Sequence, residues 1–233
     1  MYGYRGRIGV VLPADNAVME PEFARLAPDG VSSHVVRLQK MPREEMPAGA
    51  AMVASAFAYT RIDVVGYMCA ASSFMAGPDA NQRLVDDIGK AAGGVPGFSA
   101  STSMVDALKV LGARKVAVLA PHPAEIVQQL ESYLVASGLD VTGTHALGFA
   151  LADINDAVPE TIFRAARRLE LRDADALFIA ATNFRAIDVI ELLEADLGVP
   201  VVTSNQAAMY KALLLMGVRS PIKGYGKLLR DHV

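Results

Sequence analysis

The chain has 233 residues, of which 52% are hydrophobic and 20% charged, and its formal net charge is -3. This length and composition predict a folded globular protein with a sizeable core, and they exclude a disordered chain. Without a basic stretch a nucleic-acid partner is not expected, and without an uninterrupted apolar run of about 18 residues a membrane span is not expected.

Strand-like apolar runs alternate with segments of helical periodicity along the whole chain. In chain order, strands are predicted over residues 7–13, 33–39, 63–69, 94–99, 115–121, 140–147, 175–181 and 198–204. Helical periodicity lies between them, for example over 124–138 and 159–172. Alternation of this kind predicts an α/β fold in which parallel sheets are flanked by helices.

The order of these segments also repeats. GVPGFSASTSMVDALKVLG, from Gly94, resembles GVPVVTSNQAAMYKALLLMG, from Gly198. RIGVVLPA, from Arg7, likewise matches KVAVLAPH, from Lys115. The chain is therefore predicted to consist of two pseudo-symmetric lobes, with matched segments roughly 105–110 residues apart. The alternative is that βαβ units resemble one another through composition alone.

The lobe boundaries follow from the two Gly-Val-Pro segments, because each leads into a helix that can cross to the other lobe. We expect residues 1–97 plus 207–233 to form the first lobe and residues 98–206 to form the second. Open parallel sheets bind ligands at the carboxyl ends of their strands. The active site is therefore expected in the cleft between the lobes.

Cys69 is the only cysteine and ends the predicted strand 63–69. The alignment of the two halves places Ala181 at the matching position, on the opposite wall of the cleft. Small residues follow Cys69, and the backbone amides of Ala70 and Ala71 can turn toward an anion. A helix beginning there would favour the reactive thiolate. The alternative is a packed, unreactive thiol.

Polar side chains follow the first strand of each half. Pro13 ends the first strand, and the Asn16 side chain could donate neutral hydrogen bonds to a substrate carboxylate. The alternative is that Asp15 or Asn16 caps the next helix. His122, in the second half, could donate a hydrogen bond or shuttle a proton, or it could be a capping or surface residue.

Small polar turns follow two strands of the second half. The backbone N–H groups of Thr182 and Asn183 could form an anion nest, although Asn183 could also be a helix cap. Ser204 and Asn205 could reach the same anion. These turns and the Cys69 turn together suggest a small-carboxylate site.

The sequence contains neither a metal-binding nor a cofactor-binding motif. The other histidines, His34, His145 and His232, show no metal-ligand spacing with Cys69. No Gly-rich nucleotide-binding motif follows a strand, so neither a metal nor a cofactor is expected. The N-terminus lacks the apolar region of a signal peptide, and a lone cysteine fits a reducing cytoplasm, so a cytoplasmic location is expected.

Five segments carry a family resemblance. They are PADNAVMEPE from Pro13, YMCAASSF from Tyr67, APH from Ala120, the block from Ala181 to Ala207, and KGYGKLL from Lys223. With these segments the chain resembles the aspartate/glutamate racemase superfamily, in the branch of maleate cis-trans isomerases and arylmalonate decarboxylases. The resemblance covers nearly the whole chain.

The resemblance implies a cofactor-independent enzyme with a cysteine in each half. In maleate isomerases the cysteine matching Cys69 adds to the double bond of maleate, the second assists, and an asparagine matching Asn16 holds a carboxylate. This chain departs from the pattern, with Ala181 in place of the second cysteine and His122 in place of a tyrosine. Whether Ala181 is natural or introduced stays open at this point.

The function predicted from the sequence is cis-trans isomerisation of a small unsaturated dicarboxylate of the maleate type, with Cys69 as nucleophile. The alternatives are an arylmalonate decarboxylase-like or racemase-like enzyme, and a protein that binds a dicarboxylate without turning it over. A two-base racemase is disfavoured because alanine can be neither acid nor base. The family commonly forms oligomers, so a homodimer or homotetramer is expected.

Overall fold

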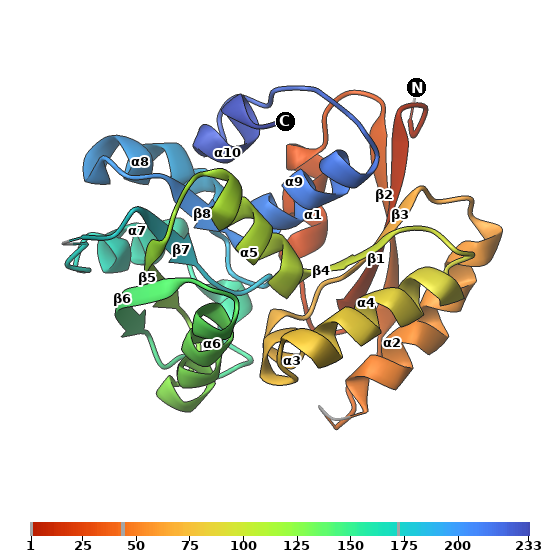
Figure 1. The fold of residues 1–233 in the computed structure, drawn as a ribbon, viewed down its shortest axis with the longest axis horizontal. Coiled ribbons are helices and arrows are strands. Elements are labelled where there is room, and N and C mark those ends of the chain that lie inside the picture. The colour runs from red at the N-terminus through yellow and green to blue at the C-terminus, as the bar shows by residue number, and fades with distance from the viewer. Residues whose placement is uncertain (1, 43–44, 172) are drawn as a thin grey trace.

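The computed structural model describes residues 2–42, 45–171 and 173–233, and this part of the chain forms two four-stranded parallel sheets (Figure 1). The first sheet has the order β2 (Val31–Leu38), β1 (Gly6–Pro13), β3 (Val64–Tyr67), β4 (Gly97–Ser99). The second has the order β6 (Asp140–Ala146), β5 (Lys115–Ala120), β7 (Ala176–Ile179), β8 (Val201–Thr203). Both sheets therefore share one strand order, and the predicted α/β fold of two similar halves is confirmed.

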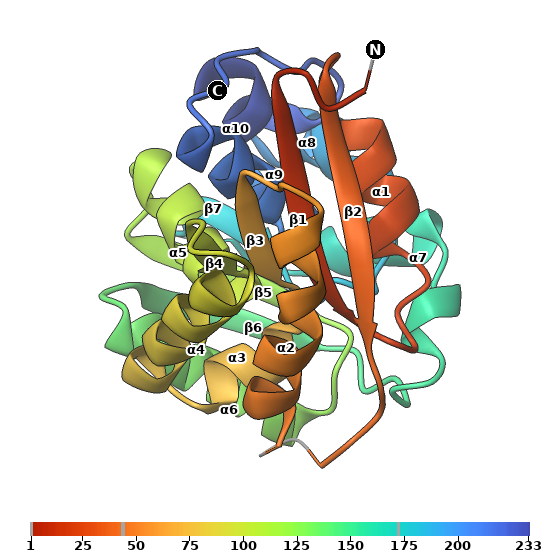
Figure 2. The same cartoon turned by 90° about the vertical axis from the view of Figure 1, so that its right-hand side faces the viewer.

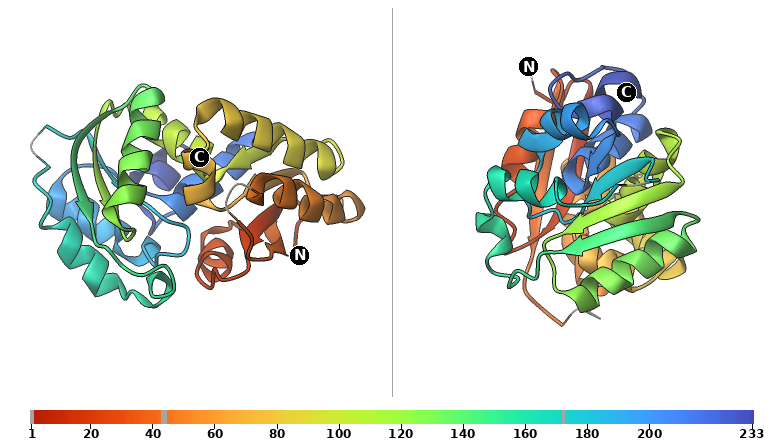
Figure 3. Two further views of the ribbon diagram at one scale, coloured as in Figure 1. Left: turned by 90° about the horizontal axis from the view of Figure 1, so that it is seen from below. Right: turned by 90° about the vertical axis from the view of Figure 1, so that its left-hand side faces the viewer.

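Helices flank both sheets. In the first half they are α1 (Met19–Leu26), α2 (Met46–Ala54), the 3-10 helix η1 (Ser55–Tyr59), α3 (Ala70–Met75), α4 (Pro78–Ala91) and α5 (Ala100–Val110). The rest are α6 (Ala124–Ala136), η2 (Ile154–Asp156), α7 (Pro159–Ala166), η3 (Ile187–Val189), α8 (Ile190–Leu197), α9 (Ser204–Leu215) and α10 (Gly226–Asp231). Figure 2 looks onto the first sheet with α2 and α4 on its near side, and Figure 3 shows the two halves side by side.

The strands form where buried apolar side chains alternate between two faces. In β1, Ile8 and Val10 belong to one apolar cluster and Val11 to the other, as the two-residue period of a strand requires. The strands predicted from Gly94 and Gly198 are shorter than expected. Each begins just after a proline, because proline has no N–H for the ladder.

Two helices connect the halves. α5 follows β4 of the first sheet and contacts β8 of the second, whereas α9 follows β8 and contacts β3, β4 and α1 of the first. The two helices also pack against each other at the centre of Figure 1. α10 lies against α8, β8 and α9. The predicted lobe boundaries, 1–97 plus 207–233 and 98–206, stay a prediction.

The predicted helical segments are trimmed at their carboxyl ends. The segment 124–138 is helical to Ala136, and the segment 159–172 is helical to Ala166, while Arg172 lies outside the described residues. In the described ranges, no helix combines the length and the apolar character that crossing a membrane would require.

Candidate functional site

The strand ends of both halves open onto one cavity of about 190 Å³. Nine of the residues predicted from the sequence line it: Pro13, Asn16, Cys69, Ala70, Ala71, His122, Ala181, Thr182 and Asn183. These residues lie at the end of β1, in the segments that directly follow β1, β3, β5 and β7, or in the first turn of α3. The carboxyl ends of the central strands of both sheets thus meet at the same cavity, which is where open parallel sheets bind ligands.

Cys69 is the residue from which the short helix α3 begins. Its backbone is extended, with φ -120° and ψ 93°, and its side chain is partly exposed at the cavity. The helix predicted to follow Cys69 therefore exists, although α3 has only 6 residues. A partly exposed thiol on the cavity wall can reach a bound molecule, which a packed thiol in the core could not do.

Ala181 has a different backbone from Cys69, although the two positions match in the duplication. Its φ is 87°, in the region that residues with a Cβ avoid. The residue is buried and lines the cavity. The two walls of the cavity are therefore equivalent in topology but not in backbone geometry or chemistry.

Thr182 ties the two halves together at the cavity. Its hydroxyl accepts a hydrogen bond from Asn16 Nδ2 at 3.0 Å and donates one to the carbonyl of Met68 at 3.1 Å. Asn16 Oδ1 accepts from the N–H groups of Val18 and Met19, both at 3.0 Å. Asn16 is therefore fixed, and its second amide hydrogen remains available for a ligand in the cavity.

The peptide between Thr182 and Asn183 is oriented from behind. The Thr182 carbonyl accepts a hydrogen bond from Asn205 Nδ2 at 3.0 Å. The carbonyl and the N–H of a planar trans peptide point in opposite directions. Because the carbonyl is directed toward Asn205, the Asn183 N–H points the other way, and Asn183 lines the cavity.

The first half holds its matching peptide in the same manner. The Ala70 carbonyl accepts hydrogen bonds from Ser73 Oγ at 3.0 Å and Ser101 Oγ at 3.4 Å. The N–H of Ala71, a lining residue, is directed oppositely by the same planarity. The cavity therefore receives one such N–H from each half, which suits a ligand that carries two carboxylates.

Ser204 and Asn205 do not line the cavity, contrary to their predicted role as direct ligands of an anion. Both are buried at the start of α9. Asn205 faces away from the cavity because its amide is committed to the Thr182 carbonyl and to Glu22, at 2.6 Å from Glu22 Oε2. Asn205 therefore supports the cavity wall from behind.

Glu22 is a buried carboxyl on α1, with 6% of its surface exposed. Besides Asn205, it accepts a hydrogen bond from the Ile187 N–H at 3.4 Å. Burial raises the pKa of Glu22 to about 7 from an ordinary 4.5, although the hydrogen bond from Asn205 opposes this rise. The carboxyl thus titrates near neutral pH, behind the cavity wall.

Sequence reasoning missed two groups of functional candidates. Further lining residues come from the ends of β1 and β2, from the start of α2, and from the segment between β6 and α7: Ala14, Asp15, Leu38, Gln39, Lys40, Met41, Met46, Leu151 and Ile154. The end of β2 could have been included, because it lies beside a strand that was considered. Glu22 also carried a signal, because it occupies a buried helical position between Met19 and Leu26.

Among the residues that the structure describes, no group of three or more His, Cys, Asp or Glu side chains is arranged to hold a metal ion. The chemistry available at the cavity is that of a thiol, an imidazole, side-chain amides, a hydroxyl, an ammonium, the carboxyl of Asp15 and backbone N–H groups. This set can bind carboxylates and supply one nucleophile.

Comparison with known proteins shows which family has this fold and site. The family model described as arylmalonate decarboxylase matches residues 8–229. The chain belongs to the arylmalonate decarboxylase family. Among curated members of the branch, it is 27% identical to a maleate isomerase of Nocardia farcinica, over 97% of this chain and 96% of the relative. It is also 27% identical to an arylmalonate decarboxylase of Bordetella bronchiseptica, over 95% of this chain and 92% of the relative.

A solved structure of the arylmalonate decarboxylase branch adds a chemical detail. The Nocardia farcinica maleate cis-trans isomerase, as a cysteine-to-serine mutant, carries a covalently bound succinylcysteine intermediate. It superposes with a TM-score of 0.90 and 25% identity, covering 98% of this chain and 99% of that chain. These matches confirm the branch that the sequence motifs predicted.

Proposed function

We propose that this protein is a cofactor-independent maleate cis-trans isomerase in which Cys69 is the nucleophile. The observation that carries the proposal is the position of Cys69 in a cavity that also receives one oriented N–H from each half. A relative similar along its whole length forms a succinylcysteine, which supports the same chemistry here.

The reaction needs one thiolate and no external reagent. The Cys69 thiolate forms a C–S bond to one alkene carbon of maleate, and the π electron pair moves onto the neighbouring carboxylate as an enediolate. The former double bond is now single and can rotate. When the electron pair returns, the C–S bond breaks, the thiolate leaves, and the new double bond is that of fumarate.

The cavity's donors match the charge that develops. The N–H groups of Ala71 and Asn183 and the remaining amide hydrogen of Asn16 can hold the two carboxylates and stabilise the enediolate. We assign these three residues to substrate binding, with Pro13, Ala70 and Thr182 shaping the wall. Such neutral donors can favour the transition state without binding the ground state too tightly.

Ala181 changes what happens after addition. If the enediolate takes up a proton at carbon, it becomes a stable succinyl thioether, and a base must remove that proton before the thiolate can leave. Alanine can provide no such base. His122 lines the same cavity and is a side chain that can carry a proton. Because position 181 supplies no base, we expect the adduct to form and fumarate to be released slowly.

The first test incubates the protein with maleate in D₂O and follows fumarate by proton NMR and the Cys69 adduct by intact mass. Wild-type protein should gain the mass of one maleic acid and release fumarate slowly. Ala181→Cys should speed fumarate release by about 10²–10⁴-fold, the usual contribution of an acid–base group. Ala180→Cys, which adds a thiol next to the cavity but outside its lining, is the matched control.

Cys69→Ser should form neither adduct nor fumarate. The proposal fails if wild-type and Ala181→Cys proteins both leave maleate unchanged and unbound to Cys69. Phenylmalonate is then the next substrate, because carbon dioxide release from it would favour the decarboxylase alternative.

Three further expectations complete the proposal. A cytoplasmic location and a homodimer or homotetramer stay predictions, the second of which native mass spectrometry would check. The lobes 1–97 plus 207–233 and 98–206 also stay a prediction, which limited proteolysis near residue 97 would test.

A further inference from the structure

We propose that Glu22 is a positioning residue of the carboxylate site. Its ionised side chain, acting through Asn205, holds the Thr182–Asn183 peptide so that the Asn183 N–H is presented to a bound carboxylate. This inference rests on the proposed function to the extent that the cavity must bind a carboxylate.

The connection is a short chain of hydrogen bonds. Asn205 Nδ2 has two hydrogens, and the structure shows both engaged, one on Glu22 Oε2 at 2.6 Å and one on the Thr182 carbonyl at 3.0 Å. The Glu22 bond therefore decides which way the Asn205 amide faces. If the amide turned over, its oxygen would confront the Thr182 carbonyl, and the peptide would lose its support.

The matching position of the first half shows that this acid is not a requirement of the fold. There Ser101 takes the place of Asn205 and pairs with Ser73 at 2.5 Å, and both hydroxyls approach the Ala70 carbonyl. Two neutral side chains thus perform the same task behind Ala70. The matching peptide of the second half, on the wall that carries Ala181, is instead supported through Asn205 by the buried carboxyl of Glu22 from α1.

The hydrogen bonds of Glu22 fit its ionised form. Both of its partners, the Asn205 amide and the Ile187 N–H, are donors, and an ionised carboxylate only accepts. A protonated carboxyl still has acceptor capacity, but it has lost the negative charge that makes both of these hydrogen bonds strong. Protonation therefore weakens the observed network and favours release of the Asn205 amide.

The charged neighbours of Glu22 are fixed in pairs. Arg25, on the same helix, makes two hydrogen bonds to Asp188 of η3, and Arg185 of the preceding loop lies 3.9 Å from Asp156. Arg25, Arg185 and Asp188 line a surface hollow together with Glu22.

Two other elements pack against α1. The helix α9 presents neutral Asn205, and β2 carries His34 and Arg37, of which Arg37 pairs with Glu20. Because burial brings the pKa of Glu22 to about 7, the network should form as the pH rises through neutrality.

The lone cysteine provides an assay that does not depend on turnover. Iodoacetate and iodoacetamide both alkylate Cys69, with formation of a C–S bond and loss of iodide, but only iodoacetate carries a carboxylate. The ratio of the two rates, divided by the same ratio for free cysteine, measures carboxylate binding at the cavity. Thiolate ionisation and access cancel in this ratio. It would be measured from about pH 5.5 to 8.5.

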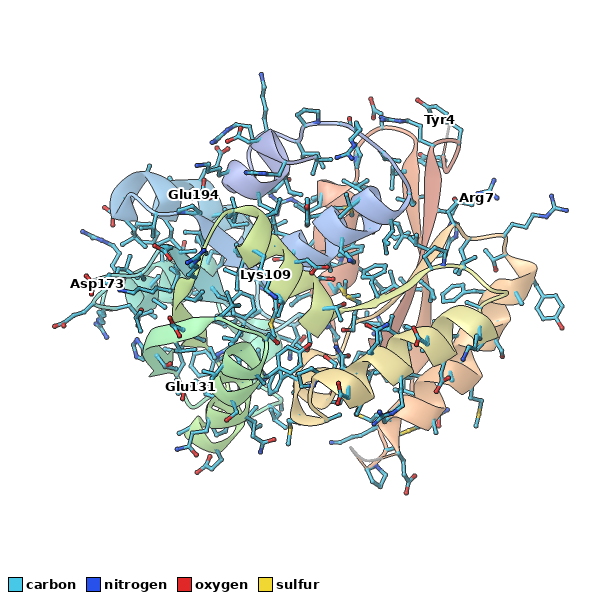
Figure 4. All side chains as sticks on the ribbon, in the orientation of Figure 1. Tyr4, Arg7, Lys109, Glu131, Asp173 and Glu194 are labelled. Carbon is cyan, nitrogen blue, oxygen red and sulfur yellow. The ribbon has the colours of Figure 1, made fainter. Side chains whose placement is uncertain are left out.

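In wild-type protein the normalised ratio should exceed one and rise as the pH passes through about 7. Glu22→Gln should lower the ratio at high pH about tenfold, as expected for loss of a hydrogen bond to a charged group, and should abolish its rise. Asn205→Ala breaks the chain at its middle and should do the same. Glu131→Gln, the same change on α6 at a residue outside the cavity lining (Figure 4), should behave as wild type.

Circular dichroism establishes that each variant is folded before it is compared. The inference is overturned if folded Glu22→Gln and Asn205→Ala keep the wild-type ratio and its pH profile, since Glu22 would then serve only stability. A wild-type ratio of one or less at every pH refutes the carboxylate site itself and this inference with it. A ratio above one without reaction with maleate refutes only the maleate assignment.

Discussion

Ala181 combines a strained backbone conformation with an unreactive side chain. Its φ of 87° costs about 1–3 kcal/mol for a residue with a Cβ, yet its methyl group offers no reactivity in return. The chain therefore has a strained backbone at the position where the family resemblance implies a second cysteine.

Ala181→Gly should accordingly raise the free energy of unfolding by about 1 kcal/mol, because glycine adopts positive φ without a steric cost. Ala180→Gly is the matched control, since that neighbour has no positive φ, and it should lower stability by about 1 kcal/mol. Urea unfolding followed by circular dichroism measures both. Equal losses in the two variants would show that the φ of Ala181 stores no strain.

At the scale of elements, the starts of α5 and α9 are fixed by the same device. Each begins with a capping box, formed by Ser99 with Thr102 and by Thr203 with Gln206. In each box two helix-end N–H donors are satisfied reciprocally, so the helix begins where the strand ends. This abrupt start sends each helix from its own sheet toward the other half.

Thr203→Val should therefore cost about 1–2 kcal/mol, because it keeps the shape of the side chain but removes the hydroxyl that accepts from the Gln206 N–H. Thr161→Val, in the first turn of α7 at an end that has no side-chain cap hydrogen bond, should change stability by less than about 0.5 kcal/mol. Urea midpoints compare the two. A Thr203→Val loss no larger than that of Thr161→Val would show that the box adds nothing.

The sequence predicted elements better than it predicted contacts. Strand ends, the duplication and the Cys69, Ala181, Thr182 turns follow from local patterns, and the structure brings these residues together. The role of Asn205 could not be predicted, because whether its side chain faces the cavity depends on a hydrogen bond to Glu22, 183 positions earlier. Such long-range bonds leave no periodic signal in a single sequence.

For the whole molecule, Glu22 links the state of the site to the stability of the fold. Its carboxyl has a pKa of about 7 when folded and 4.5 as an unperturbed group, so the folded protein holds this proton more tightly. The corresponding stabilisation is fully present below about pH 4.5 and is lost as the pH rises to about 7. The ionised form that orients Asn205 is thus the less stable form of the fold.

The unfolding free energy of wild type, measured relative to Glu22→Gln, should therefore fall by about 3 kcal/mol between pH 4 and 8, since each pKa unit corresponds to about 1.4 kcal/mol. Chemical unfolding at a series of pH values gives this difference directly. A difference that is flat across the range would mean that Glu22 titrates at its ordinary pKa.

The hydrogen bonds of the Thr182 hydroxyl determine what would happen if the chain were cut between its two halves. It belongs to one half, yet both of its partners, Asn16 and the Met68 carbonyl, belong to the other. Neither fragment of a chain cut between the halves would contain a finished cavity. The preference of Cys69 for iodoacetate over iodoacetamide would return only when the two fragments associate. If each fragment were fused to a different protein, this preference would therefore report the association of those two proteins.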